Sequence, residues 1–99
     1  MKINHTAVAG TMESSDIQIT LIPSAEEEIK IDLQSPVLKP FGRQIKSVIL
    51  TVLEHYHITG VQVQAIDKGA LDCVIKARTE AAVHRALDIE NSDMPWEVE

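Results

Sequence analysis

The feature that most constrains the fold of this chain is a change in the spacing of its apolar residues. Over residues 17–21, 29–33 and 61–65 apolar residues alternate with polar ones, the period of two typical of half-buried strands. Over residues 40–56 and 70–87 they recur three and four positions apart, which is typical of amphipathic helices. A chain that changes period in this way has to combine strands with helices.

The order of these segments predicts an α+β fold. The expected strands cover residues 3–12, 16–22, 28–34 and 61–66, and the expected helices cover residues 40–57 and 70–87. The short connection after Pro23 favours an antiparallel hairpin of the second and third strands. Gly60 follows the first helix, where a left-handed residue is often found. The simplest arrangement is a two-layer sandwich, with a mainly antiparallel four-stranded sheet and both helices on one face.

The chain length allows one domain. Its 99 residues lie at the lower end of the common range of about 100–150 residues for a single domain. We expect that domain to cover residues 1–87 and an acidic tail to cover residues 88–99. Trp96 follows Pro95 in that tail, and we expect it either to pack back on the domain or to anchor a partner.

Composition excludes several classes of protein. The formal net charge is −6, from 9 cationic and 15 anionic side chains, so binding to a nucleic-acid backbone is not expected. A single cysteine excludes a disulfide scaffold. The longest apolar runs are far shorter than the roughly 20 residues of a membrane span, and the start of the chain has no signal-peptide pattern. The sequence therefore favours a soluble, cytoplasmic protein without nucleic-acid or membrane partners.

The polar residues form no recognisable catalytic or metal-binding motif. His55 and His57 lie two positions apart and point to different sides of a helix, which is not a metal-binding spacing. Cys73 has no base near it in the sequence that would activate a thiol nucleophile, so a packed or bystander thiol is favoured. Neither a nucleophile elbow nor a phosphate-binding glycine loop is present. We predict no catalytic residue and no metal site.

One serine stands out through its surroundings. On pattern alone, Ser14 is a turn residue between two strands. However, residues 7–16, AVAGTMESSD, resemble the N-terminal signature of the acyl carrier proteins of citrate lyase, the gamma subunits of that complex. The resemblance covers nearly the whole chain, and its further segments are FG at 41–42, GVQV at 60–63, DKGALDC at 67–73, KAR at 76–78 and PWE at 95–97.

This resemblance implies a covalent prosthetic group on the serine of the GTxES block. The group is 2′-(5″-phosphoribosyl)-3′-dephospho-coenzyme A, joined through a phosphodiester, and the matching position is Ser14. Ser15 is adjacent and chemically equivalent, so motif position alone decides between the two serines. Ordinary phosphopantetheine carriers use an Asp-Ser-Leu motif at the start of a helix, and that motif is absent from this sequence.

The resemblance also implies a function and partners. The family carries acetyl and citryl thioesters between a transferase (alpha) subunit and a lyase (beta) subunit, and a separate enzyme attaches the group. A carrier of this kind is non-catalytic, since the cofactor supplies the reactive thiol. We further hypothesise that Glu13 and Asp16 keep the phosphodiester off the carrier by charge repulsion. The alternatives are the related carrier of malonate decarboxylase and a small regulatory α+β module without a covalent group.

Overall fold

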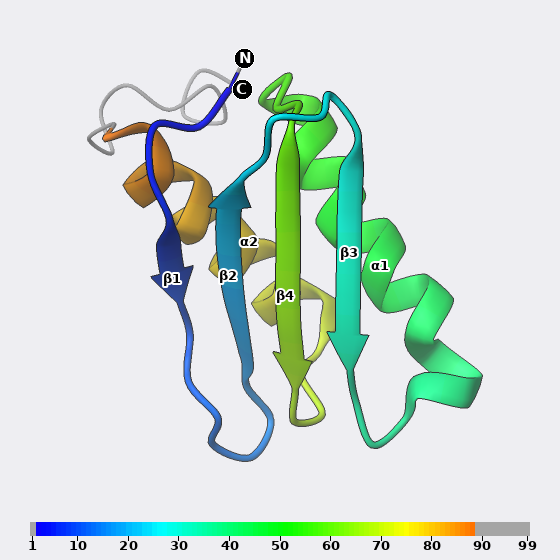
Figure 1. Ribbon diagram of the computed structural model, residues 1–99. Coiled ribbons are helices and arrows are strands. Elements are labelled where there is room, and N and C mark those ends of the chain that lie inside the picture. The colour runs from blue at the N-terminus through cyan, green and yellow to red at the C-terminus, as the bar shows by residue number, and fades with distance from the viewer. Residues whose placement is uncertain (1, 89–99) are drawn as a thin grey trace.

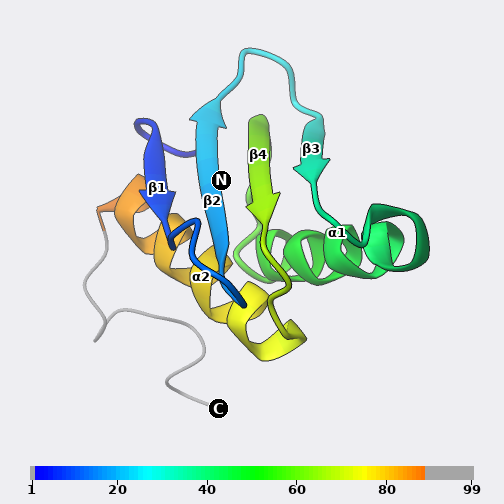
Figure 2. The same ribbon diagram turned by 90° about the horizontal axis from the view of Figure 1, so that it is seen from below.

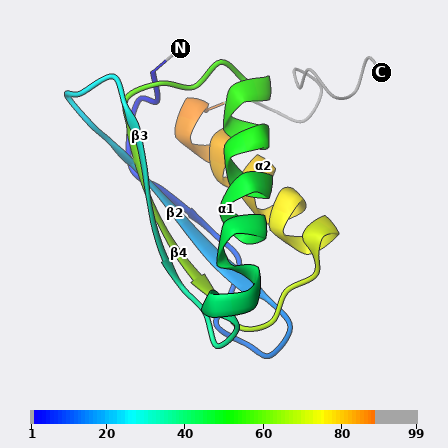
Figure 3. The ribbon, with the colours of Figure 1, turned by 90° about the vertical axis from the view of Figure 1, so that its right-hand side faces the viewer.

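The computed structural model describes residues 2–88, and the elements occur in the predicted order. The strands are β1 (Ala7–Ala9), β2 (Ile17–Pro23), β3 (Ile29–Gln34) and β4 (Val61–Asp67), and the helices are α1 (Leu38–His55) and α2 (Asp72–Leu87). One layer is the sheet and the other is the pair of helices, both on the same face (Figures 2 and 3). The predicted α+β sandwich is confirmed. The tail and Trp96 lie outside the described residues.

The sheet is mixed, with strand order β1-β2-β4-β3. β1 pairs with β2 and β2 with β4 in antiparallel fashion, whereas β3 and β4 are parallel and α1 connects them. The predicted hairpin of the second and third strands is therefore wrong, because β4 lies between them. The side chains of Val61, Val63 and Ala65 are at most 1% exposed, which suits β4 to the centre of the sheet. The inward side chains of β3 are only half-buried, which suits an edge.

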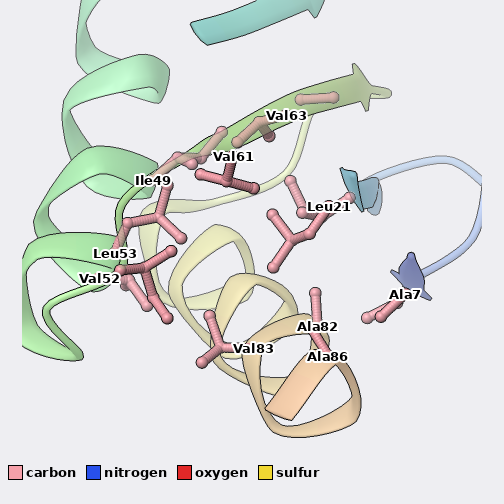
Figure 4. Close-up of a cluster of buried hydrophobic side chains, with 14 of the residues drawn as sticks. Ala7, Leu21, Ile49, Val52, Leu53, Val61, Val63, Ala82, Val83 and Ala86 are labelled. Carbon is pink, nitrogen blue, oxygen red and sulfur yellow. The ribbon is translucent and has the colours of Figure 1, made fainter. Parts of the chain in front are cut away.

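The core fills the space between the sheet and the two helices (Figure 4). α1 contributes a continuous apolar stripe that includes Ile45, Ile49 and Leu53. α2 buries the small residues Ala82 and Ala86 completely, so its backbone can approach the sheet closely. Within residues 2–88, neither helix is long and apolar enough to cross a membrane.

Most boundaries lie within two residues of the prediction, and the first strand differs more. The first strand is shorter because the Asn4 amide donates to the Ala86 carbonyl at 3.1 Å, so the preceding residues run along the end of α2. α1 begins at Leu38, which leaves Pro40 in its first turn. His57 adopts the left-handed conformation just after α1, with φ of 57°, and Gly60 adopts it three residues later, with φ of 64°.

The connections β1–β2, β3–α1 and β4–α2 all lie at one end of the sheet, the lower end in Figure 1. This follows from the topology, because β2 runs antiparallel to β4 while β3 runs parallel to it. Residues that are far apart in the sequence therefore meet here, including Ser14, Ser35 and Lys68.

Candidate functional site

Ser14 lies at the apex of the turn that connects β1 to β2. The amide of Asp16 donates to the carbonyl of Glu13 at 3.2 Å and closes this four-residue turn. Ser15 has a φ of 66°, and a positive φ at the third position is the signature of a type II turn. Ser14 is exposed, and within residues 2–88 its hydroxyl makes no hydrogen bond. The turn position predicted for Ser14 is confirmed, and its hydroxyl is open to reagents in solution.

The turn is fixed to the neighbouring β4–α2 connection. The Ser15 amide donates to the Lys68 carbonyl at 2.8 Å, and the Lys68 amide donates to the Asp16 carbonyl at 2.9 Å. These two bonds continue the pairing of β2 with β4 beyond the last strand pair, Ile17 and Asp67. The backbone on both sides of the turn is therefore held, while the Ser14 side chain projects from it.

A buried carboxylate holds the turn from the inside. Asp16 is 8% exposed, and its carboxylate accepts two hydrogen bonds of 3.0 Å from the guanidinium of Arg78 on α2. It also accepts a 2.6 Å bond from the Thr11 hydroxyl and a 2.7 Å bond from the Ile17 amide. The Arg78 and Thr11 hydrogen bonds hold the pKa of Asp16 well below its usual range.

The hypothesis that Glu13 and Asp16 repel a phosphodiester stays a prediction, and the two carboxylates differ in their surroundings. The charge of Asp16 is compensated by Arg78 and lies inward, whereas Glu13 is exposed on the turn. Arg78 is a site residue that reasoning from the sequence missed. It lies 62 residues from Asp16, and no local pattern links the two.

Ser14 forms part of the wall of a surface hollow of about 400 Å³, which we call the serine hollow. Its lining residues come from all three connections and from the ends of β3 and β4: Met12, Ser14, Gln34, Ser35, Pro36, Ile66, Asp67 and Lys68. Asp67 is 2% exposed, and it fixes the β3–α1 connection at the hollow because its carboxylate accepts a 2.7 Å hydrogen bond from the Ser35 hydroxyl. It also accepts bonds from the amides of Gly69 and Ala70, at 3.1 and 2.8 Å.

Two further hollows lie elsewhere on the described part of the chain. One of about 380 Å³ shares Asp67 with the serine hollow and lies between the start of α1 and the β4–α2 connection. Its rim includes Phe41 and Leu71, whose side chains are 54% and 69% exposed. Another, of about 280 Å³, lies between α1 and α2 and is lined in part by Val48 and Lys76.

The histidines and the cysteine do not converge on Ser14. Cys73 is exposed on the first turn of α2. His84 interacts with the Tyr56 hydroxyl at 3.4 Å, at the C-terminal ends of the two helices, whereas the turn lies at the end of the sheet where both helices begin. Within residues 2–88, no group of three histidine, cysteine, aspartate or glutamate side chains is placed to hold a metal ion.

Comparison with known proteins places this geometry in a family. Residues 4–86 match the profile of an acyl carrier protein family described as malonate decarboxylase delta subunit. A citrate lyase acyl carrier protein of Lactiplantibacillus plantarum is 58% identical over 98 residues, which cover 99% of each chain. A citrate lyase acyl carrier protein of Streptococcus uberis is 59% identical over 90 residues, 91% of this chain and 88% of that one.

Among solved structures, a chain of a Pseudomonas malonate decarboxylase hetero-tetramer in complex with malonate has the same fold. The TM-score is 0.68 at 17% identity, over 83% of this chain and 84% of that chain. At this identity the likeness concerns the fold alone. The sequence relatives are far closer and extend along nearly the whole chain, and they show that the protein belongs to the citrate lyase acyl carrier protein family.

Proposed function

We propose that this chain is the acyl carrier subunit of citrate lyase and that Ser14 bears 2′-(5″-phosphoribosyl)-3′-dephospho-coenzyme A through a phosphodiester. The observation that carries the proposal is the position of Ser14, an exposed hydroxyl at the apex of a turn whose backbone is held on both sides. A covalent arm needs an accessible attachment atom and a firm base, and this turn supplies both.

The surroundings of Ser14 suit a bulky group. The serine hollow has a volume of about 400 Å³, in the lower part of the usual range for small-molecule sites. Lys68 lines it and brings a cation to a place where phosphates would lie. When bound, the prosthetic group supplies a thiol that carries acetyl and citryl units as thioesters. Within residues 2–88 the one cysteine, Cys73, is on α2 and outside the hollow lining, so it is not that thiol.

The attachment step requires a second enzyme. The Ser14 oxygen forms a new bond to phosphorus in an activated anhydride form of the group. The anhydride bond from that phosphorus breaks, the phosphate or pyrophosphate on its other side leaves, and the serine proton passes to a base. No side chain within residues 2–88 hydrogen-bonds to the Ser14 hydroxyl. The attaching enzyme therefore supplies the base, and this chain supplies the oriented acceptor.

The partners follow from the carrier role. A transferase (alpha) subunit and a lyase (beta) subunit catalyse the two half-reactions that convert citrate to oxaloacetate and acetate, in the cytoplasm. This chain contributes a rigid base, because β2 is paired on both sides and α2 is fastened to the turn through Arg78. A tether on such a base makes each encounter with an active site intramolecular, at a high effective concentration.

A second candidate is the carrier of malonate decarboxylase. The description of the family profile favours it, and so does the fold of the Pseudomonas chain. The curated relatives at 58% and 59% identity favour citrate lyase. Loading of the charged carrier by each purified transferase subunit, with the acyl mass read by intact-mass spectrometry, distinguishes the two carriers.

The proposal as a whole is tested by charging. The parent chain, Ser14→Ala and Ser15→Gly are incubated with the attaching enzyme and the activated precursor, and intact masses and peptide maps are recorded. We expect the parent and Ser15→Gly to gain the group and Ser14→Ala to remain unmodified. If Ser14→Ala gains the group and Ser15→Gly does not, the attachment site is Ser15. Failure of all three, where a known carrier is charged, would overturn the family function.

A further inference from the structure

The serine hollow has a lining of apolar, amide and cationic side chains, which a mere attachment point would not require. Besides Ser14, its lining includes Ile66 at the end of β4 and Gln34 at the end of β3. These two residues are register partners on the face of the sheet away from the helices. Met12, which is 53% exposed, adds a second apolar surface. The hollow thus combines two apolar side chains and one amide with the exposed Ser14 hydroxyl.

Lys68 brings a cation to this hollow, and its main chain is held by hydrogen bonds. Lys68 exchanges main-chain hydrogen bonds of 2.8 and 2.9 Å with Ser15 and Asp16, so its side chain starts from a fixed point next to the Ser14 turn. A phosphate attached near Ser14 would find this ammonium group within the same hollow. Glu13, on the exposed turn, opposes the attraction and keeps it modest.

We propose that the serine hollow binds the adenosine phosphate portion of the arm that Ser14 carries, so that the pantetheine portion alone swings between active sites. The inference rests on the proposed function. In the proposed group, one phosphate and one ribose separate the serine from the adenosine, and Ser14 itself lines the hollow, so the adenosine would be tethered close to it. Ile66 and Met12 would contact the base, the Gln34 amide would hydrogen-bond with it, and Lys68 would pair with phosphate.

We expect the serine hollow to bind the adenosine phosphate portion weakly. The covalent tether raises its local concentration enough for the hollow to be occupied for much of the time. A short flexible tether gives an effective concentration of the order of millimolar. A hollow with a dissociation constant of about 1 mM for the free ligand would then be occupied about half of the time. The adenosine portion could therefore leave the hollow readily, and while it is bound the moving part of the arm is shorter.

The test is a titration of the uncharged 99-residue chain, labelled for NMR, with 3′-dephospho-coenzyme A and separately with pantetheine. Cys73→Ser serves as the background, because the exposed Cys73 could form a disulfide with either probe. We expect the first probe to shift the signals of Ile66, Gln34 and Lys68, with saturation at a dissociation constant of about 1 mM. Pantetheine should leave these signals unchanged.

Two lysine variants test the role of charge. Lys68→Ala should weaken binding of 3′-dephospho-coenzyme A about two- to fivefold, the usual range for one exposed ionic contact. Lys76→Ala is the matched control, since Lys76 lines the hollow between the helices instead. Absence of a saturable shift, equal shifts with pantetheine, or equal losses in the two variants would each overturn the inference.

The charged protein gives a second readout that separates this inference from the proposed function. Intact mass first establishes whether Ser14 is charged. In the charged chain, adenine protons should show NOEs to the methyl groups of Ile66 and Met12, while the pantetheine signals stay narrow. Charging without these NOEs would refute the binding site and leave the proposed function standing. Saturable binding of free 3′-dephospho-coenzyme A to a chain that cannot be charged would support the binding site and refute the proposed function.

Discussion

Arg78 on α2 and Asp16 at the start of β2 form a two-bond ion pair, with both nitrogen–oxygen distances at 3.0 Å. The pair spans 62 residues of sequence and fastens the turn that carries Ser14 to the helical layer. Asp16 is buried and the side chain of Arg78 is 41% exposed, so the pair lies at the boundary between core and solvent. Helix and turn therefore keep a fixed relation at the end of the sheet where Ser14 lies.

The ion pair of Asp16 with Arg78 should make the free energy of unfolding depend on pH in the acid range. The pKa of Asp16 is lowered in the folded state. The contribution of this carboxylate to the free energy of unfolding is therefore complete above the ordinary aspartate pKa of about 4, and it is lost as the pH falls towards the lowered value. Urea unfolding of the parent and of Asp16→Asn should therefore differ more at pH 7 than at pH 2. An equal difference at both pH values would contradict the prediction. Glu13→Gln is the control, as an exposed carboxylate on the same turn.

A second pH prediction concerns the other end of α2. The His5 ring nitrogen lies 3.0 Å from the Asp88 carboxylate, and this hydrogen bond raises the pKa of His5. Its contribution to stability is complete below about pH 6.5 and is lost as pH rises through the raised folded value. NMR titration of His5 should show its pKa falling to the ordinary range in Asp88→Asn. An unchanged His5 pKa in that variant would show that the pair does not form in solution.

Ser15 should tolerate glycine better than a branched residue. Its φ of 66° is in the left-handed region, which costs most side chains roughly 1–2 kcal/mol. Glycine removes that cost but adds chain entropy in the unfolded state, so Ser15→Gly should change the free energy of unfolding by less than about 1 kcal/mol. Ser15→Val should lower it by more than about 1 kcal/mol. Equal stability of the two variants in thermal unfolding would refute the turn conformation.

Gly10 should be intolerant of alanine. It has a φ of 91°, and a Cβ atom there would lie 1.9 Å from the Ile17 carbonyl oxygen. Gly69 is a matched control, with a φ of 94° and no atom within 4 Å of its Cβ position. We expect Gly10→Ala to lower the free energy of unfolding by at least about 2 kcal/mol more than Gly69→Ala. A similar loss in both variants would mean that backbone strain, and not the clash, governs Gly10.

Ser14, the proposed attachment residue, should contribute little to folding. Ser14 is exposed and its hydroxyl has no hydrogen-bond partner within residues 2–88, so Ser14→Ala should change the free energy of unfolding by no more than about 0.5 kcal/mol. Circular dichroism melts of the parent and the variant test this directly. A larger loss would show that the failure of Ser14→Ala to accept the group cannot be assigned to the missing oxygen alone.

The sequence by itself determined the kinds of element, their order and the turn that holds Ser14. These depend on local patterns, because a period of two or of 3.6 places apolar residues on one face of a strand or helix. The motif around Ser14 also pointed to the family without any knowledge of the structure. Local pattern was enough wherever the deciding neighbours lie within a few residues.

The tertiary structure decided which strands pair and what surrounds Ser14. The strand period does not say which strand becomes the neighbour, so β4 could insert between β2 and β3 against the expectation of a hairpin. That insertion brings Lys68 to the Ser14 turn, and the packing of α2 on β2 brings Arg78 to Asp16. Such pairs are selected by burial and hydrogen bonding across the fold, and neither is encoded by the residues next to them in the sequence.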